Sequence, residues 1–322
     1  MIKNNFRAVS MFAGIGGMDL GATGGFTFLK KRYKSLPVEI VLASDFNKSA
    51  LAIYERNFKH NILLADIGQL DGSMVPKHDI LMGGFPCQSF SVAATNPPRL
   101  GYKDERGQLF FELVRILKET KPRCFVAENV KGLLSANEGK AFPLVLSEFE
   151  NSGYFVKWKV LNAVEFGVPQ KRQRVFIVGF RLKKDFEAFD FPNPMQDSVA
   201  LSSILEVDPV DEQYFFSDKA VRGMRTTKNS KTMNKGRDQN PDGPCNTVGA
   251  HLAKVSLNST DPVLLDGGRY RMFTPREVAR IQSFPERYQL VGSRQSLYRG
   301  LGNAVAPVVM WHVMRSIVAA MS

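Results

Sequence analysis

Residues 1–180 alternate short apolar runs with amphipathic stretches, and this alternation limits the possible folds more than any other feature. The apolar runs have the length of buried strands, and the stretches between them place apolar residues at helical spacing. Repeated strand–helix–strand units are typical of a parallel sheet covered by helices, so we expect an α/β fold. The predicted strands are residues 7–11, 39–43, 79–82, 124–127, 154–161 and 175–180, and the predicted helices are 48–58 and 108–120.

The pattern changes near Lys183, which indicates a second, smaller domain. Residues 219–237 contain seven basic residues and no acidic one. Helical spacing returns in PREVARIQSF after Thr274, and residues 307–321 are apolar enough for a closing helix. We therefore expect a discontinuous domain of residues 1–182 and 272–322, with a smaller domain, residues 183–271, between its two parts.

The charge of the chain narrows the class of partner. Forty-three Lys and Arg against thirty-one Asp and Glu leave a formal charge of +12, which favours binding to a polyanion such as nucleic acid over a merely basic surface. We find no signal peptide and no run long enough to span a membrane, so we expect a cytoplasmic protein. The three cysteines show no metal-binding or disulfide spacing, so we expect no metal, and Cys124 fits an inert thiol in a buried strand.

A glycine-rich loop, FAGIGG at residues 12–17, follows the first predicted strand and lets the backbone approach a ligand closely. An ordinary turn and a nicotinamide or flavin site are the alternatives, but the third glycine of the GxGxxG fingerprint is missing. Asp45 and Asp66 end the next strand-like runs. Each fits a helix cap, but together beside the loop they favour a nucleoside pocket in which Asp45 binds ribose hydroxyls.

The stretch GGFPCQSFS, residues 83–91, places Cys87 after a proline in a constrained turn. A nucleophilic cysteine needs surroundings that favour the thiolate, and the following amides and hydroxyls supply them. Glu128 ends another strand-like run, and the carboxyl ends of parallel strands meet in one crevice, so Cys87 and Glu128 are expected to face each other. Arg172 and Arg174, two residues apart before a strand, are expected to point to one side.

Together these strings resemble the DNA (cytosine-5) methyltransferase family of bacterial restriction-modification systems, over nearly the whole chain. The resemblance is carried, in order, by FAGIGG, SDF, DI, GGFPCQSFS, ENV, QKRQRV, PREVARIQSFP and GNAV. Asp45 is a departure, because the family more often has glutamate there. Residues 183–270 match no family string except Thr247-Val248, which is similar to a pair in the target-recognition domain.

The resemblance implies a doubly wound, Rossmann-like sheet that binds S-adenosylmethionine, with residues 183–271 as the target-recognition domain. It implies that Cys87 adds to carbon 6 of a cytosine rotated out of duplex DNA, that Glu128 acts at ring nitrogen 3, and that Arg174, with Arg172, holds the exocyclic oxygen. The product of the cofactor is S-adenosylhomocysteine. The implied cofactor residues are Phe12, Gly14, Ile15, Gly16, Gly17, Asp45, Phe46, Asp66, Ile67, Pro86, Leu109, Asn303 and Val305.

Duplex DNA is the implied partner, and residues 92–106 are expected to form a lid over it. The expected DNA-contacting residues are Gln88, Ser91, Arg99, Arg222, Arg225, Lys228, Lys231, Arg237 and Thr247. We also expect a monomer, with a cognate restriction endonuclease that acts on the same site without forming a stable complex. The alternatives are a cytosine-5 methyltransferase of transfer RNA and a DNA-binding module without activity.

Overall fold

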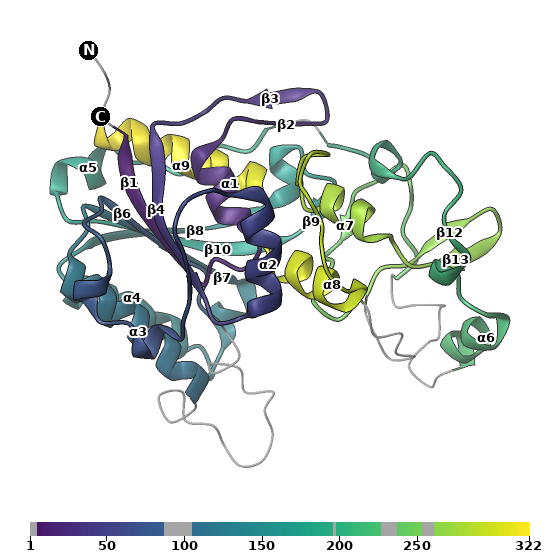
Figure 1. Cartoon of the computed structure of the whole chain (residues 1–322), viewed down its shortest axis with the longest axis horizontal. Coiled ribbons are helices and arrows are strands. Elements are labelled where there is room, and N and C mark those ends of the chain that lie inside the picture. Colours follow the sequence, from purple (N-terminus) through teal and green to yellow (C-terminus); the bar gives the residue numbers. More distant parts are fainter. Residues whose placement is uncertain (1–4, 87–104, 196–197, 227–236, 253–260) are drawn as a thin grey trace.

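The computed structural model describes residues 5–86, 105–195, 198–226, 237–252 and 261–322. At its centre lies a seven-stranded sheet with strand order β5-β4-β1-β6-β7-β10-β8 (Figure 1). All six predicted strands lie in this sheet, and the short β5 is additional. The strands are β1 (Phe6–Met11), β4 (Val38–Asp45), β5 (Ile62–Leu64), β6 (Ile80–Gly83), β7 (Cys124–Val130), β8 (Phe155–Asn162) and β10 (Gln173–Phe180).

The sheet is mixed, so the expectation of a parallel sheet was wrong for one strand. β1, β4, β5, β6 and β7 pair in parallel, whereas β10 runs antiparallel to both β7 and β8. The reason is the connection from β8 to β10, residues 163–172, which holds only the 3₁₀ turn η4 (Ala163–Phe166) and the short β9 (Gln170–Lys171). Parallel pairing needs a longer crossover, usually a helix, so the chain returns in the opposite direction.

Helices cover both faces of the sheet, as a doubly wound fold requires (Figure 1). Neighbouring residues in a strand point to opposite faces, and accordingly Ala8 belongs to one apolar cluster and Val9 to the other. The helices packed in the first cluster are α1 (Gly17–Thr23), α2 (Lys48–Asn57) and α9 (Pro307–Met321), and those in the second are α3 (Glu105–Thr120) and α4 (Ala141–Asn151). Both predicted helices and the closing helix are confirmed, and α9 packs closely against α1.

One described helical stretch, Arg294–Met321, is long and apolar enough to cross a membrane by composition. Its most apolar window is 67% buried inside the protein. The apolar side chains of this stretch therefore belong to the core.

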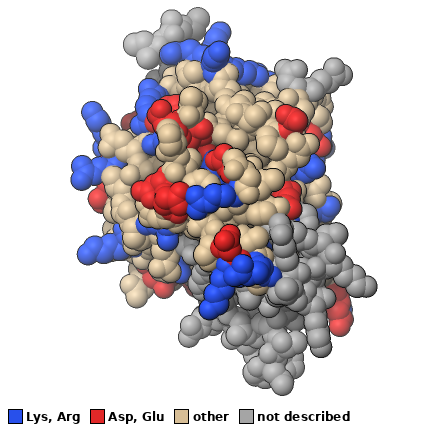
Figure 2. Space-filling view, turned by 90° about the vertical axis from the view of Figure 1, so that its right-hand side faces the viewer, with Lys and Arg blue, Asp and Glu red and all other residues tan. Residues whose placement is uncertain are grey.

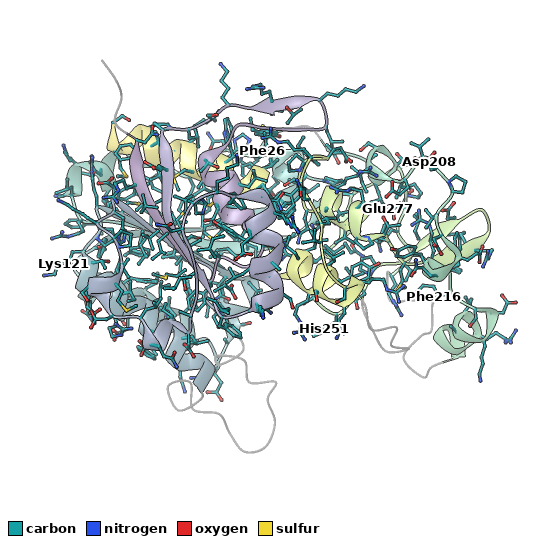
Figure 3. All side chains as sticks on the ribbon, viewed as in Figure 1. Phe26, Lys121, Asp208, Phe216, His251 and Glu277 are labelled. Atoms are coloured by element: carbon teal, nitrogen blue, oxygen red, sulfur yellow. The ribbon has the colours of Figure 1, made fainter. Side chains whose placement is uncertain are left out.

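Short elements form a smaller lobe beside the sheet, at the right of Figure 1. Phe216 lies well within this lobe (Figure 3) and packs with Val263 and Met272 in a small apolar cluster of its own. The elements drawn in this part are α6 (Asp218–Thr226), β12 (Leu264–Asp266) and β13 (Arg269–Arg271). Helices α7 (Pro275–Ile281) and α8 (Arg294–Asn303) lie between this lobe and the sheet, and their buried apolar side chains belong to the first apolar cluster. Two further strand pairs are β2 (Phe26–Phe28) with β3 (Lys31–Tyr33), and β9 with β11 (Cys245–Asn246).

Helix α5 (Lys183–Ala188) belongs with the large sheet rather than with this lobe. Its Asp185 is 1% exposed and forms an ion pair with Arg123, the residue before β7. The distance from Nε of Arg123 to Oδ2 of Asp185 is 2.6 Å. The ring of Phe189, just after α5, lies 5.2 Å from that of Phe180 in β10. We therefore propose that the smaller domain begins after α5 and not at residue 183.

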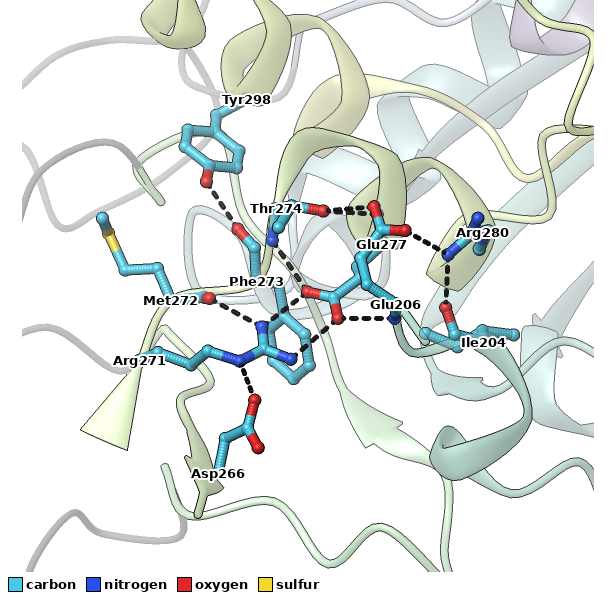
Figure 4. A network of polar contacts seen from close by, with 10 residues as sticks. All are labelled: Ile204, Glu206, Asp266, Arg271, Met272, Phe273, Thr274, Glu277, Arg280 and Tyr298. Carbon is cyan, nitrogen blue, oxygen red and sulfur yellow. Dashed lines mark hydrogen bonds and ion pairs between the residues drawn. The ribbon is translucent and has the colours of Figure 1, made fainter. Parts of the chain in front are cut away.

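A buried ion-pair network joins the smaller lobe to α7 (Figure 4). The Arg271 side chain donates to both carboxylate oxygens of Glu277, at 2.7 and 2.9 Å, and to Asp266 at 2.6 Å. The Glu277 carboxylate also accepts the amides of Thr274 and Glu206. The side chains of Arg271 and Glu277 are 1% and 0% exposed, so removing Arg271 would leave the buried carboxylate of Glu277 without this counter-ion. This network fixes where β13 ends and α7 begins.

Candidate active site

A cavity of about 920 Å³ opens where the carboxyl ends of the parallel strands meet, a size suited to a cofactor together with a substrate base. It is bounded by the segments that follow β1, β4 and β6, by the end of β7 and by the start of β10. Helix α8 and the residues after it close the remaining side. The lining includes Phe12, Gly14, Ile15, Gly17, Asp45, Phe46, Pro86, Leu109, Glu128, Arg172, Arg174, Asn303 and Val305, all of which were expected from the sequence.

The glycine loop after β1 needs glycine for two different reasons. Gly14 has φ +56°, and a Cβ there would meet no atom of the described residues within 4 Å, so among these residues it leaves open space at the cavity wall. Gly16 has φ +82°, and a Cβ there would collide with the Phe58 ring. Gly16 therefore shapes the loop from behind and does not line the cavity, in contrast to Gly14.

Asp45 holds the glycine loop against the end of β4. Its Oδ2 accepts the amide of Gly14 at 2.8 Å, and its Oδ1 accepts the amide of Asn47 at 2.8 Å. Burial raises the pKa of this carboxyl group, and the amides of Asn47 and Gly14 oppose that effect. A carboxylate can accept about four hydrogen bonds, so capacity for a ribose hydroxyl remains. The neighbouring Phe46 is 68% exposed and lines the cavity. An aromatic ligand stacked on its ring would remove this apolar surface from water.

Asp66 and Ile67 do not line the cavity. Asp66 caps the 3₁₀ turn η1 (Ile67–Gln69) by accepting the amide of Gly68 at 3.0 Å. Ile67 is 5% exposed and packs in the core beneath α3. Asp66 is therefore a cap of a 3₁₀ turn, which was the alternative for an acid at a strand end. Neither Asp66 nor Ile67 is part of the proposed cofactor site.

Glu128 lies beside the turn that leads into Cys87. A Cβ on Gly84 would stand 3.4 Å from Oε2 of Glu128, and the Asn129 side chain donates to the carbonyl of Phe85 at 3.0 Å. Asn129 therefore holds the backbone directly before Pro86. Cys87 itself lies outside the described residues, as do Gln88, Ser91 and Arg99.

Glu128 is also paired with Arg174, whose Nε stands 3.0 Å from Oε1. Glu128 is 8% exposed, and burial raises the pKa of its carboxyl group, an effect that Arg174 and then Arg172 counteract. A raised pKa favours the protonated form, which is the form that can give a proton to a substrate nitrogen.

Arg172 plays a different part from Arg174. It is 2% exposed and donates to three backbone carbonyls, those of Val248, Gly302 and Ala304, at 3.0, 2.8 and 3.1 Å. Both arginines line the cavity, as expected, but these donors of Arg172 are occupied by the protein. Arg172 ties the segment around Val248 to the loop after α8, so the contact with the substrate base remains a proposal for Arg174.

The residues expected to contact DNA are mostly outside the described part or engaged elsewhere. Arg237 is 5% exposed and donates from Nε to the carbonyl of Asp261 at 2.8 Å. This burial argues against the expected contact between Arg237 and DNA. Arg222 is exposed on α6, and Thr247 is exposed and donates to the carbonyl of Lys171. Lys228, Lys231 and the side chain of Arg225 lie outside the described residues. Figure 2 shows basic and acidic side chains interspersed over the described part of this end of the molecule.

Sequence reasoning missed the contribution of two helices to the cavity. Ser49 and Ala50 of α2, and Gln295, Ser296, Arg299 and Gly300 of α8, line it. These residues form no motif with the glycine loop along the chain. Their one signal was the return of helical spacing near the C-terminus, which indicated a return to the first domain but not which side chains face the cavity.

A buried polar cluster supports the glycine loop from below. Asp19 in α1 is 0% exposed and accepts hydrogen bonds from Ser10 Oγ at 3.0 Å and from Tyr54 Oη at 2.9 Å. The Tyr288 hydroxyl donates to the carbonyl of Ile15 within the loop. Burial raises the pKa of Asp19 to about 6 from an ordinary value of 3.8.

This shift predicts a pH-dependent stability difference for Asp19→Asn. Between pH 3.8 and about 6 the folded protein keeps a proton that the unfolded chain has lost, so the contribution of Asp19 to stability is full below pH 3.8 and is lost as the pH rises through 6. The whole change is about 3 kcal/mol, of which about 2 kcal/mol falls between pH 4.5 and 7.5. Urea unfolding measures the free energy of unfolding of wild type and of Asp19→Asn. The difference, wild type minus variant, should be about 2 kcal/mol larger at pH 4.5 than at pH 7.5. The exposed change Glu138→Gln is the control, and a difference for Asp19→Asn that does not vary with pH would refute the prediction.

The comparisons with known proteins agree with this geometry. The family model described as C-5 cytosine-specific DNA methylase matches residues 6–319. The Type II methyltransferase M.NlaX of Neisseria lactamica is 36% identical over 98% of this chain and 97% of its own length. The Type II methyltransferase M.Bsp6I of a Bacillus species is 32% identical over 98% of this chain and 99% of its own. Among solved structures, the methyltransferase EhMeth of Entamoeba histolytica has the same fold, with a TM-score of 0.80, 17% identity and coverage of 99% and 100% of the two chains.

Proposed function

Because the chain belongs to the family of C-5 cytosine-specific DNA methylases, we propose that it methylates carbon 5 of a cytosine rotated out of duplex DNA, through a covalent bond to Cys87 and with S-adenosylmethionine as methyl donor. It is a DNA cytosine-5 methyltransferase. The observation that carries the finer proposal is the position of Glu128, which is buried beside the turn that leads into Cys87 and paired with Arg174.

The cavity fits S-adenosylmethionine. Gly14 leaves open space at the wall, Phe46 offers an exposed ring for an adenine, and Asp45 keeps acceptor capacity for a ribose. Leu109, Asn303 and Val305 line the same cavity and complete the proposed pocket. When bound, S-adenosylmethionine supplies an activated methyl group that a carbon nucleophile can take up.

The side chains of the protein make carbon 5 of cytosine such a nucleophile. The Cys87 thiolate forms a bond to carbon 6 while Glu128 gives a proton to ring nitrogen 3, and the ring becomes an enamine whose electron density lies at carbon 5. After methylation the proton on carbon 5 passes to solvent, and the electrons of that bond form the double bond between carbons 5 and 6. The bond between sulfur and carbon 6 breaks with its electrons returning to sulfur, and Glu128 regains its proton from ring nitrogen 3. The steps leave Cys87 and Glu128 as they began.

The remaining residues hold this arrangement in place. Arg174 keeps the Glu128 carboxyl group oriented and is the residue proposed to hold the exocyclic oxygen of the base. Asn129 fixes the carbonyl of Phe85 and so the entry to the Cys87 turn. Holding the reacting groups in fixed positions lowers the barrier to a reaction of this kind.

The relatives are named Type II methyltransferases, which supports a proposal for the partner in function. We propose that this chain acts as a cytoplasmic monomer on double-stranded DNA, and that a restriction endonuclease reads the same site without forming a stable complex with it. The part of residues 183–271 that follows α5 forms the proposed target-recognition domain, and the charge of +12 would favour its association with DNA.

The proposed substrate is tested by supplying S-adenosylmethionine with a labelled methyl group to the purified protein with either plasmid DNA or transfer RNA. Label is expected in DNA, on carbon 5 of cytosine after digestion to nucleosides, and sequencing after bisulfite treatment would show the neighbouring bases. Label in transfer RNA alone would support the alternative that the chain methylates RNA. Tight DNA binding with label in neither would support a binding module without activity.

A further inference from the structure

Arg299 is a cation in the cavity wall, and no described residue of the chain serves as its counter-ion. It lies in α8, lines the cavity and is exposed. Within the described part of the chain it forms no hydrogen bond or ion pair. The other charged groups of the described lining are engaged: Glu128 pairs with Arg174, and Asp45 accepts two backbone amides.

The position of Arg299 along α8 places it next to the glycine loop. A Cβ on the neighbouring Gly300 would stand 2.6 Å from Cγ2 of Ile15, so this turn of α8 packs directly on the loop. A Cβ on Gly17 would collide with the carbonyl oxygen of Val305, so the loop after α8 also touches the glycine loop. Arg299 therefore belongs to the end of the cavity formed by α8 and the glycine loop.

The proposed cofactor has one anionic group, the carboxylate of its methionine part. If the ribose lies at Asp45 and the adenine at the rings of Phe12 and Phe46, the methionine part extends along the glycine loop towards α8. A guanidinium group matches a carboxylate with two parallel hydrogen bonds and keeps its charge at all working pH values.

We propose that Arg299 binds the carboxylate of the methionine part of S-adenosylmethionine. This inference rests on the proposed use of that cofactor. It makes Arg299 a binding residue that selects nucleosides with an intact amino-acid part over those without one.

The test measures ligand binding in the absence of DNA, by calorimetry or competition with labelled ligand. S-adenosylhomocysteine carries the carboxylate, whereas 5′-methylthioadenosine has the same adenosine and a neutral sulfur but no amino-acid part. Arg299→Gln is expected to weaken binding of S-adenosylhomocysteine about 10- to 100-fold, because it removes a charge-assisted pair of hydrogen bonds. The affinity for 5′-methylthioadenosine should stay unchanged. Arg299→Lys should restore part of the loss.

Arg294→Gln is the matched control, because Arg294 is exposed on the same helix but stands over the Tyr214 ring outside the cavity. It should bind both ligands as wild type does. Equal weakening of both ligands by Arg299→Gln, or no weakening of either, would overturn the inference. In a separate DNA-binding measurement, weaker binding of DNA by Arg299→Gln with wild-type binding of both ligands would also overturn it and make Arg299 a phosphate contact. If wild type binds neither ligand, the proposed cofactor is wrong, an outcome distinct from failure at Arg299.

Discussion

Cys87→Ala is expected to abolish methyl transfer, with a rate at least about 10⁴-fold below wild type. Carbon 5 of cytosine is a weak nucleophile, and alanine cannot form the bond to carbon 6 that turns the ring into an enamine. The defect should lie in the chemical step and not in the cofactor pocket, because Gly14, Asp45 and Phe46 are unchanged. The measurement is single-turnover transfer of labelled methyl to DNA, together with binding of S-adenosylhomocysteine.

Cys245→Ala is the control for this variant. Cys245 is a free thiol in β11 with 0% exposure, so its replacement tests the loss of a cysteine without touching the cavity. It should methylate DNA at close to the wild-type rate. Methylation by Cys87→Ala within tenfold of wild type would show that another group, or none, bonds to the base.

Glu128→Gln is expected to lower the rate of methyl transfer by about 10²- to 10⁴-fold, with little effect on binding of S-adenosylhomocysteine. The amide of glutamine can donate a hydrogen bond but cannot transfer a proton to ring nitrogen 3, and it removes the charge that Arg174 balances. Burial raises the pKa of Glu128, and the group acts as an acid, so the wild-type rate should fall as the pH rises through that pKa. The variant should lose this alkaline decline.

The matched control is Glu212→Gln, which breaks an exposed ion pair with Arg269 in the smaller lobe. Exposed pairs contribute little, so its rate and its pH profile should follow wild type. A Glu128→Gln enzyme with the wild-type rate and the wild-type pH profile would remove Glu128 from the mechanism.

The longer strands of the sheet could be predicted because most of their residues are apolar, although β8 also carries two lysines. The two apolar clusters follow from the alternation of residues such as Ala8 and Val9. The direction of β10 could not be predicted, because strand direction depends on the length and path of the connection after β8 and not on the strand's own residues. β5 has only three residues, too few for a periodic signal.

The lining of the cavity was predictable where a side chain stands at a strand end, as Glu128 does. The role of a side chain was not predictable where the same residue type has a structural partner. Asp66 caps a turn, and Arg237 donates to the carbonyl of Asp261. Arg172 donates to three backbone carbonyls. Arg299 escaped notice because the packing of α8 on the glycine loop links residues nearly three hundred positions apart.

The central claim is that a single sulfur atom bonds transiently to the target base, and a trapped adduct tests it most directly. Duplex DNA in which 5-fluorocytosine replaces cytosine blocks the last step, because fluorine cannot leave carbon 5 as a proton does. With S-adenosylmethionine present, a complex that survives denaturation should form, and mapping of its peptides should place the modified base on Cys87. Methylation of ordinary DNA by a protein that forms no such adduct, or forms it at another residue, would contradict the account.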